Sequence, residues 1–424
     1  MLNSKKLLDF EQHSHIGSLL CVLVGAIFAV RPYFVFLFST SSVIPDSVYG
    51  DYGTLQLPLR EFIRNEFLAG RVPLWIPYLG CGMPIHASQQ ASVTYPLLTP
   101  FVILLGANFG ILLGANFGIK FSVFIHVLIA YFGQYVLCRK LGISVFASCF
   151  AGIVTAQSGF FTSHLMVGHL TVIVAYCWLP WLIVSILRLS RSPSPRSAAI
   201  LAIVTVLIVL SGHPQIPYYA ALLGLVCGII NFGYGQSKHH QLRYLTWMSS
   251  GIVLALLVLA IQILPTVELL QDGMQASERK LSSFASSFSL TPIELSRIVF
   301  PRIKGMPFTS SPLFEAHDAF HEETPYLGIL PLLLFLFAIT RKNTKSWELV
   351  VAFFVIISIL ISLGDSTPFF EYALTIVPGL SLFRCPGRIF SVTSILIPLV
   401  AASGLDNLID RTKLVGGYRA VALV

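Results

Sequence analysis

Residues 49–96 read YGDYGTLQLPLREFIRNEFLAGRVPLWIPYLGCGMPIHASQQASVTYP and follow directly after the first hydrophobic segment of the chain. In LREFIRNEF (59–67), Arg and Glu residues recur every three to four positions, which predicts a short amphipathic helix along the membrane surface. The stretches 73–77 and 80–84 hold too many Pro and Gly residues to be helical. The density of charged, aromatic, Pro and Gly residues between two hydrophobic segments favours a functional site over a flexible connector.

The composition is that of a membrane protein. Of the 424 residues, 55% are hydrophobic and only 11% are charged, whereas a soluble domain carries about a quarter charged residues. Apolar runs long enough to cross a bilayer recur along the whole chain, which predicts an all-α polytopic membrane protein. The net charge of +8 comes from short basic loops in the positive-inside pattern, so it indicates topology and not a nucleic-acid partner.

The basic clusters predict the cytoplasmic loops, and the apolar segments between them alternate as about ten spans. These spans lie near 17–38, 118–137, 145–163, 170–187, 198–211, 217–233, 245–267, 325–340, 347–363 and 388–408. We expect residues 1–16 to be a cytoplasmic N-terminus, 17–38 an uncleaved signal anchor, and 17–424 a single transmembrane domain. The long outer loops are then 39–96, 268–324 and 364–387. They hold 14 of the 19 acidic residues, so any chemistry is expected outside.

Residues 97–137 are too long for one span, and LLGANFGI occurs twice in tandem, at 104–111 and 112–119. Two full spans here would violate the charge rule, so we interpret 97–117 as a re-entrant or interfacial segment. Five of the seven cysteines fall in or beside spans, where apolar packing is the default role. Cys81 and Cys385 both fall in predicted outer loops, which leaves a disulfide between them open.

Several short motifs follow one another along the chain, most of them in or beside the predicted outer loops. They are Gly50-Asp51, Gln56, Pro58, Pro73-Leu74-Trp75, Gln89, Tyr95-Pro96, Gly212-His213-Pro214-Gln215, Gln262, Pro265-Thr266, Glu268, Phe300-Pro301, Tyr326, Arg384, Pro386 and Arg388. Together they cover most of the chain and resemble the bacterial YfhO-type membrane proteins, which are glycosyltransferases of the C superfamily. Members of that family are often longer, with further spans and a C-terminal extracytoplasmic part.

The resemblance implies a fold of the C superfamily (GT-C) and an inverting transfer of sugar at the outer face of the bacterial cytoplasmic membrane. The donor would be a polyprenyl-phosphate sugar, and the acceptor a cell-envelope glycan, lipid or protein. An acidic residue in the first outer loop activates the acceptor hydroxyl in such enzymes. No cofactor is implied, and membrane lipids would be further partners.

Asp51 matches that acidic residue and is the candidate catalytic base, although an N-cap or turn role would explain it equally simply. Asp46 is the fallback. The candidate substrate-binding residues are Gln56, Arg60, Trp75, Gln89, His213, Gln215, Glu268, Arg384 and Arg388.

Some of these have a plainer explanation, whereas the 212–215 turn favours a site role. Arg60 and its neighbour Arg64 can simply pair with glutamates on a surface helix, at well under 1 kcal/mol per exposed pair. Polar residues such as His213 at a membrane-buried helix end are costly unless they are paired or functional. Arg384 and Arg388 can anchor a span at the interface, but a guanidinium there also suits a lipid-linked phosphate.

Glu268 either neutralises a nearby arginine or acts as a second carboxylate of the site. The patch 317–323, with His317, Asp318, His321, Glu322 and Glu323, has residue types that bind metals. A solvated acidic loop is its simpler interpretation, so a divalent metal is left open.

Two other functions remain open from the sequence. A transporter or flippase of lipid-linked sugars would share the basic phosphate contacts, but it should show a half-to-half repeat and ionisable residues deep within spans. A non-catalytic subunit of an envelope-glycan assembly is the second alternative.

Overall fold

The computed structural model describes residues 3–38, 50–108, 114–232, 237–272, 281–305 and 319–421. Asp46, His317 and Asp318 lie outside these ranges. Within them the chain is helical, and β structure is limited to one antiparallel bridge between Ile76 and Met83. The helices are α1 (Asn3–Val30), α2 (Phe34–Phe38), α3 (Leu57–Leu68), α4 (Thr99–Asn108), α5 (Gly114–Lys140), α6 (Val145–Ala156), α7 (Gly159–Met166), α8 (Leu170–Arg191), α9 (Pro195–Leu210), α10 (Gln215–Phe232), α11 (Lys238–Asp272), α12 (Leu281–Ala285), α13 (Pro292–Leu295), α14 (Ile329–Thr340), α15 (Ser346–Ser362), α16 (Phe369–Ile376) and α17 (Phe390–Val421).

Seven helical segments in the described residues are long and apolar enough to cross a membrane, so the all-α multi-pass prediction is confirmed. They are Ile16–Phe38, Ala115–Lys140, Val145–Met166, Leu170–Arg191, Gln215–Phe232, Lys238–Gln271 and Pro386–Asp410. The other three predicted spans coincide with the shorter apolar helices α9, α14 and α15. A 12-residue helix such as α14 is about 18 Å long, less than the roughly 30 Å of a hydrocarbon core. The total of ten spans therefore stays a prediction.

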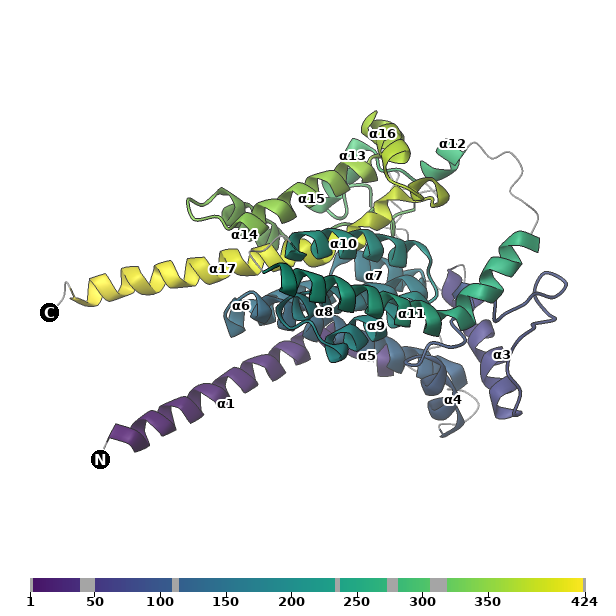
Figure 1. Cartoon of the computed structure of the whole chain (residues 1–424), viewed down its shortest axis with the longest axis horizontal. Helices are drawn as coiled ribbons and strands as arrows, with labels where there is room; N and C mark the ends of the chain where they lie inside the picture. Colours follow the sequence, from purple (N-terminus) through teal and green to yellow (C-terminus); the bar gives the residue numbers. More distant parts are fainter. Residues whose placement is uncertain are drawn as a thin grey trace.

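The helices pack in a bundle with α8 and α17 at its centre (Figure 1). In the most apolar stretches of these two spans, 83% and 89% of the residues are buried inside the protein, compared with only 17% in α11. Leu, Ile and Val side chains cover the exposed face of α11. Such a surface is suited to lipid, which places α11 at the edge of the bundle.

A proline near the end of α11 ties this helix to the first outer loop. Pro265 has no N–H, so the carbonyl of Ile261 lacks its helical donor. His86 fills that gap, with Nε2 3.0 Å from Ile261 O. Gln262 Nε2 then donates to His86 O at 2.9 Å, and Thr266 Oγ1 donates to Ala87 O at 2.8 Å. Figure 1 shows the last turns of α11 bending away from the rest of the helix, as expected at a proline.

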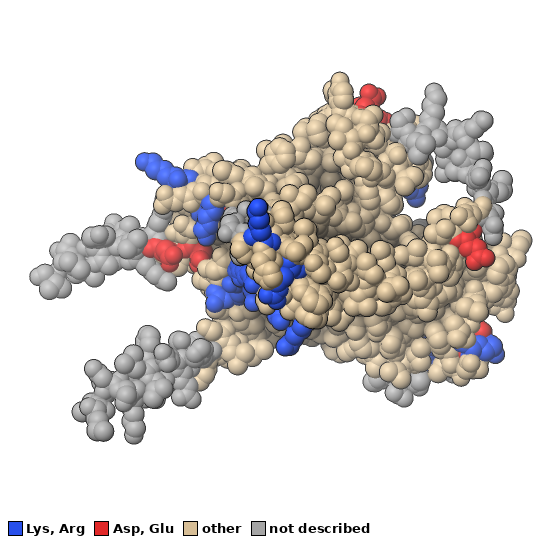
Figure 2. Space-filling model, viewed as in Figure 1, with Lys and Arg blue, Asp and Glu red and all other residues tan. Residues whose placement is uncertain are grey.

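Charged side chains are unevenly distributed along the bundle. Lys and Arg gather at the end from which α1 and α17 project (Figure 2), whereas α3, α12 and α16 lie towards the other end (Figure 1). The exposed Arg191 donates to Lys140 O at 2.9 Å, and Arg243 donates to Pro193 O at 3.0 Å. These contacts join three basic segments into one surface, the one that the sequence predicts to be cytoplasmic.

The structure adds detail on the N-terminus, on the predicted re-entrant segment and on Cys81 and Cys385. Helix α1 begins at Asn3 and continues past residue 16 into the first span without a break. Part of the predicted re-entrant segment forms α4, which packs against α5 and, at ten residues, is too short to cross a bilayer. Cys81 and Cys385 are free thiols, one exposed and one buried, so the structure contains no disulfide between them.

Candidate functional site

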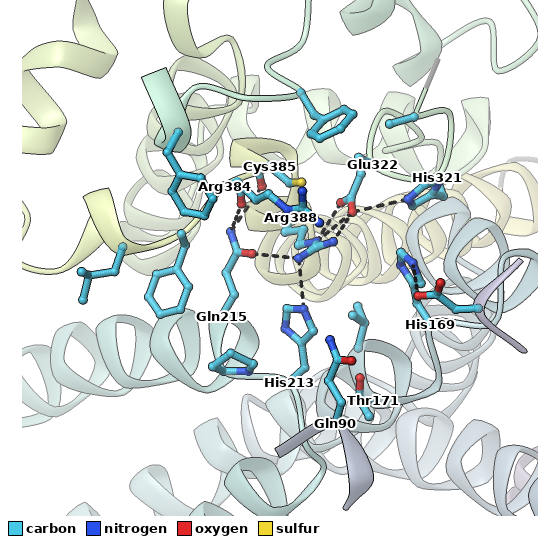
Figure 3. Close-up of a pocket in the computed structure, with 18 of the residues that line it drawn as sticks. Gln90, His169, Thr171, His213, Gln215, His321, Glu322, Arg384, Cys385 and Arg388 are labelled. Atoms are coloured by element: carbon cyan, nitrogen blue, oxygen red, sulfur yellow. Dashed lines mark hydrogen bonds and ion pairs between the residues drawn. The ribbon is translucent and has the colours of Figure 1, made fainter. Parts of the chain in front are cut away.

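A cavity of about 440 Å³ lies where six segments distant in sequence meet (Figure 3). The first outer loop, the starts of α8 and α10 with the turns before them, the 284–288 segment, the 319–322 loop and the 382–388 segment all contribute to its walls. Six of the ten predicted site residues line it: Asp51, Gln56, His213, Gln215, Arg384 and Arg388.

Backbone contacts hold Asp51 in this wall. Its N–H donates to Val167 O at 3.0 Å. Gly168 has φ +79°, and a Cβ there would lie 2.4 Å from the amide nitrogen of Tyr52, so only glycine allows the first outer loop to approach so closely. Just beyond Asp51, the chain makes a π-helical turn (Tyr52–Gln56), a feature common at functional sites.

The Asp51 carboxylate pairs with a histidine. Its Oδ2 lies 3.3 Å from Nε2 of His169, the residue before α8. This contact lowers the pKa of Asp51, so the carboxylate is ionised near neutral pH. Its side chain is half exposed and therefore accessible from the cavity.

A second glycine positions the turn before α10. Gly212 has φ +100°, and a Cβ there would lie 2.2 Å from Ser92 Oγ. Ser92 Oγ donates to Ser211 O at 2.7 Å, which fastens this turn to the end of the first outer loop. The turn thereby carries His213 and Gln215 to the cavity.

Arg388 lies at the centre of the polar network in Figure 3. Its Nε donates to both carboxylate oxygens of Glu322, at 2.8 and 3.0 Å, and its Nη1 donates to His213 Nε2 at 3.0 Å and Gln215 Oε1 at 3.2 Å. Burial, followed by the Arg388 charge, holds the pKa of His213 well below its usual value, so that this ring is a neutral acceptor. Gln215 in turn donates to Arg384 O at 2.8 Å.

Glu322 also belongs to this network, although the sequence indicates that it lies in a solvated acidic loop. Its side chain is 1% exposed. Burial opposes ionisation, but the charge of Arg388 outweighs it and holds the pKa of Glu322 well below its usual value. The sequence contains one signal for this role, which is that the 317–323 patch has residue types that bind metals. It could not reveal that the Glu322 side chain is buried.

Histidines surround Glu322 on the side away from Gln215. The ring of His321 lies 4.7 Å from that of His169 and 5.6 Å from that of His164, measured between centroids. His164, His169 and Glu322 each offer a ligand atom within 4.8 Å of the others, so these three can hold a metal ion. The sequence analysis named neither His164 nor His169 as a site residue.

Arg60 lies behind the cavity and not in it. Its buried guanidinium donates to Gln56 Oε1 and Gln90 O, both at 3.2 Å, and to Ala91 O. Burial lowers the pKa of Arg60 to about 9. Arg60 thus braces Gln56 and, within the described part of the chain, makes no ion pair with a glutamate, whereas Arg64 does pair with Glu61, at 3.1 Å.

The remaining three predicted residues lie elsewhere. Trp75 is 55% exposed and packs against Gly82. Gln90, and not its neighbour Gln89, lines the cavity. Glu268 is exposed near the end of α11 and does not reach the cavity.

The cavity thus combines an ionised carboxylate, a buried ion pair, neutral imidazoles and one exposed guanidinium, that of Arg384. Such a set can accept a proton from a hydroxyl and bind an anion. No protein-family model matches the chain, and no curated protein matches it.

Proposed function

We propose that the protein is a membrane glycosyltransferase of the GT-C type. It moves a sugar from a polyprenyl-phosphate donor to a cell-envelope acceptor, at the extracytoplasmic face of the bacterial cytoplasmic membrane and with its N-terminus inside. The observation that supports this proposal is the single cavity in which Asp51 and Arg384 take part, built from segments that the sequence predicts to be outside. Its volume of about 440 Å³ lies within the range of small-molecule sites.

Asp51 is the proposed general base. The acceptor hydroxyl attacks the anomeric carbon, its proton passes to the Asp51 carboxylate, and the bond from that carbon to the carrier phosphate breaks. A carboxylate with a lowered pKa is fully ionised for this step. His169 orients the Asp51 side chain through the 3.3 Å contact.

Arg384 is the proposed contact for the leaving phosphate. Its side chain is exposed at the cavity, and the Phe288 ring centroid lies 5.7 Å from the guanidinium carbon. Arg388 is less suited to this role because Glu322, His213 and Gln215 already accept most of its N–H donors. Arg388 instead holds the wall of the cavity together.

The test is a transfer assay with the purified full chain in nanodiscs, radiolabelled polyprenyl-phosphate sugars and cell-envelope acceptors. Asp51→Asn is expected to lower transfer by about 100- to 10,000-fold, because a positioned base contributes that much. Asp51→Glu should recover little. Arg384→Gln should raise the KM for the donor by about tenfold or more, as expected for loss of a charged hydrogen bond.

The matched control is Asp365→Asn, which alters an exposed aspartate that does not line the cavity. It should transfer sugar like the wild type. Near-normal transfer by Asp51→Asn at equal protein levels would refute the role of Asp51. The absence of transfer by the wild-type chain with any donor would instead favour the flippase or the non-catalytic subunit.

A further inference from the structure

His164, in the last turn of α7, presents an unprotonated nitrogen to the interior. Its side chain is fully buried, and Nδ1 donates to Phe160 O at 2.9 Å. A neutral imidazole carries one N–H, so this bond leaves Nε2 with a lone pair. Nε2 has no hydrogen-bond partner among the described residues, and it faces Glu322 Oε2 at 3.4 Å.

Two acceptors that face each other in a buried site repel unless a cation lies between them. That cation is either a proton, which makes His164 an imidazolium, or a metal ion. Arg388 already neutralises the charge of Glu322. A buried imidazolium would therefore add an uncompensated positive charge, which is costly. This disfavours the proton.

The distance between His164 and Glu322 also fits a metal better than a hydrogen bond. Charge-assisted N–H···O bonds are about 2.7–2.9 Å long. His164 Nε2 and Glu322 Oε2 lie 3.4 Å apart. Ligand atoms about 2.0–2.1 Å from a tetrahedral zinc ion lie roughly 3.4 Å apart.

His164, His169 and Glu322 have neighbours of the kind that orient metal ligands in proteins. His169 Nε2 faces the Asp51 carboxylate, while its buried Nδ1 has no hydrogen-bond partner within the described chain. Metal-binding imidazoles commonly contact a carboxylate or a backbone carbonyl through their second nitrogen, and both His169 and His164 do so. Arg388 orients the third ligand, Glu322.

We propose that His164, His169 and Glu322 bind a divalent metal ion in the wall of the cavity, with Zn²⁺ the best match. Two imidazoles and one carboxylate are a donor set of open zinc sites, which keep a fourth position for water or substrate. His169 and Glu322 line the cavity, so that position is open to it. This inference goes beyond the proposed sugar transfer, and its test does not depend on that activity.

The test uses the full chain, purified in detergent, stripped with a chelator and titrated with Co²⁺. The wild type is expected to bind one Co²⁺ per chain with the visible absorption bands of a tetrahedral site, and Zn²⁺ should displace it. Loss of an outer-shell partner weakens metal sites by about 10–100-fold, so loss of a ligand in His164→Gln should weaken binding by more than that. His169→Gln, with a side chain that is partly exposed, is the second variant in case His164→Gln does not fold.

The matched control is His240→Gln, because His240 contacts Ser190 O at 2.6 Å near the basic end of the bundle, far in sequence from the cluster. Its Co²⁺ binding should equal that of the wild type. A wild-type chain that binds no Co²⁺ or Zn²⁺ would overturn the proposal and identify the cation as a proton. Unchanged binding by both His164→Gln and His169→Gln would overturn it as well.

Discussion

Among the buried Arg–Glu pairs of the described residues, two lie in different parts of the molecule and have different surroundings. Arg341 directly follows α14 and Glu348 lies in the first turn of α15, with side chains 1% and 0% exposed. Arg388 and Glu322 lie at the cavity, with side chains 12% and 1% exposed. The two pairs are chemically the same, so the difference between them depends on what else surrounds each carboxylate.

The pair of Arg341 and Glu348, which we call the closed pair, makes further hydrogen bonds through both of its side chains. Arg341 Nη1 donates to Ser403 O at 3.1 Å, and the backbone N–H of Lys345 donates to Glu348 Oε2 at 2.9 Å. These contacts use both ends of the pair to join α14, α15 and α17. Neither residue lines the cavity. We interpret this pair as a structural cross-link.

The pair of Arg388 and Glu322, which we call the open pair, borders the cavity. Imidazoles of His164 and His321 approach the carboxylate at 3.4 and 3.5 Å without hydrogen-bonding geometry, and a cavity adjoins it. The comparison teaches that a buried ion pair alone does not identify a functional site. The cavity beside the pair, and the imidazoles that face its carboxylate, do so.

The largest effect on stability is expected from breaking the closed pair. Arg341→Gln leaves the Glu348 carboxylate buried and uncompensated, which costs about 3–5 kcal/mol of unfolding free energy. Thermal unfolding in detergent should show a large fall in Tm. The double variant Arg341→Gln/Glu348→Gln should recover most of it, because no charge then remains buried. A single variant as stable as the wild type would show that this pair is not a cross-link.

Breaking the open pair should destabilise the fold less and abolish its ligand. In Glu322→Gln, the amide oxygen, His213 and Gln215 still accept from Arg388, and water can enter from the cavity. We expect a loss of about 1–3 kcal/mol, as for one unmade buried hydrogen bond. Co²⁺ titration of the same sample should show no tetrahedral site. If Glu322→Gln and Arg341→Gln lower the Tm equally and Co²⁺ still binds, the two pairs do not differ in function.

An exposed pair gives the smallest effect. Arg71 and Glu66 approach to 2.7 Å on the surface after α3. Water and salt screen such a pair, so Arg71→Gln should leave the Tm, the Co²⁺ binding and the sugar transfer unchanged. A measurable fall in Tm would mean that burial is not what separates the three ion pairs.

Much of the architecture could be predicted from the sequence because the bilayer restricts it to apolar helices. The charged spacing in 59–67 falls within α3 (Leu57–Leu68). The turn 212–215 could be predicted as polar and costly at a helix end, and it does reach the cavity. Both patterns are local, and local patterns are what a sequence displays.

The errors and omissions concern contacts between distant segments. Arg60 looks like one more charge on the exposed face of a helix, but the turn at 89–91 covers it and takes up its guanidinium. Glu322 looks like part of an acidic loop, yet Arg388, 66 residues away, holds it buried. Spacing along one segment cannot reveal which other segment will cover it.

The tie between α11 and the first outer loop has a mechanical consequence. Helix α11 is 35 residues long, about 52 Å, so it exceeds the roughly 30 Å hydrocarbon core. Near its start, Arg243 is fastened to Pro193 O, and near its end Gln262 is fastened to His86 O. A helix longer than the bilayer adjusts its tilt to the local thickness. We therefore expect α11 to act as a lever that moves the 86–90 segment, and with it Gln90 in the wall of the cavity, as the thickness of the surrounding membrane changes.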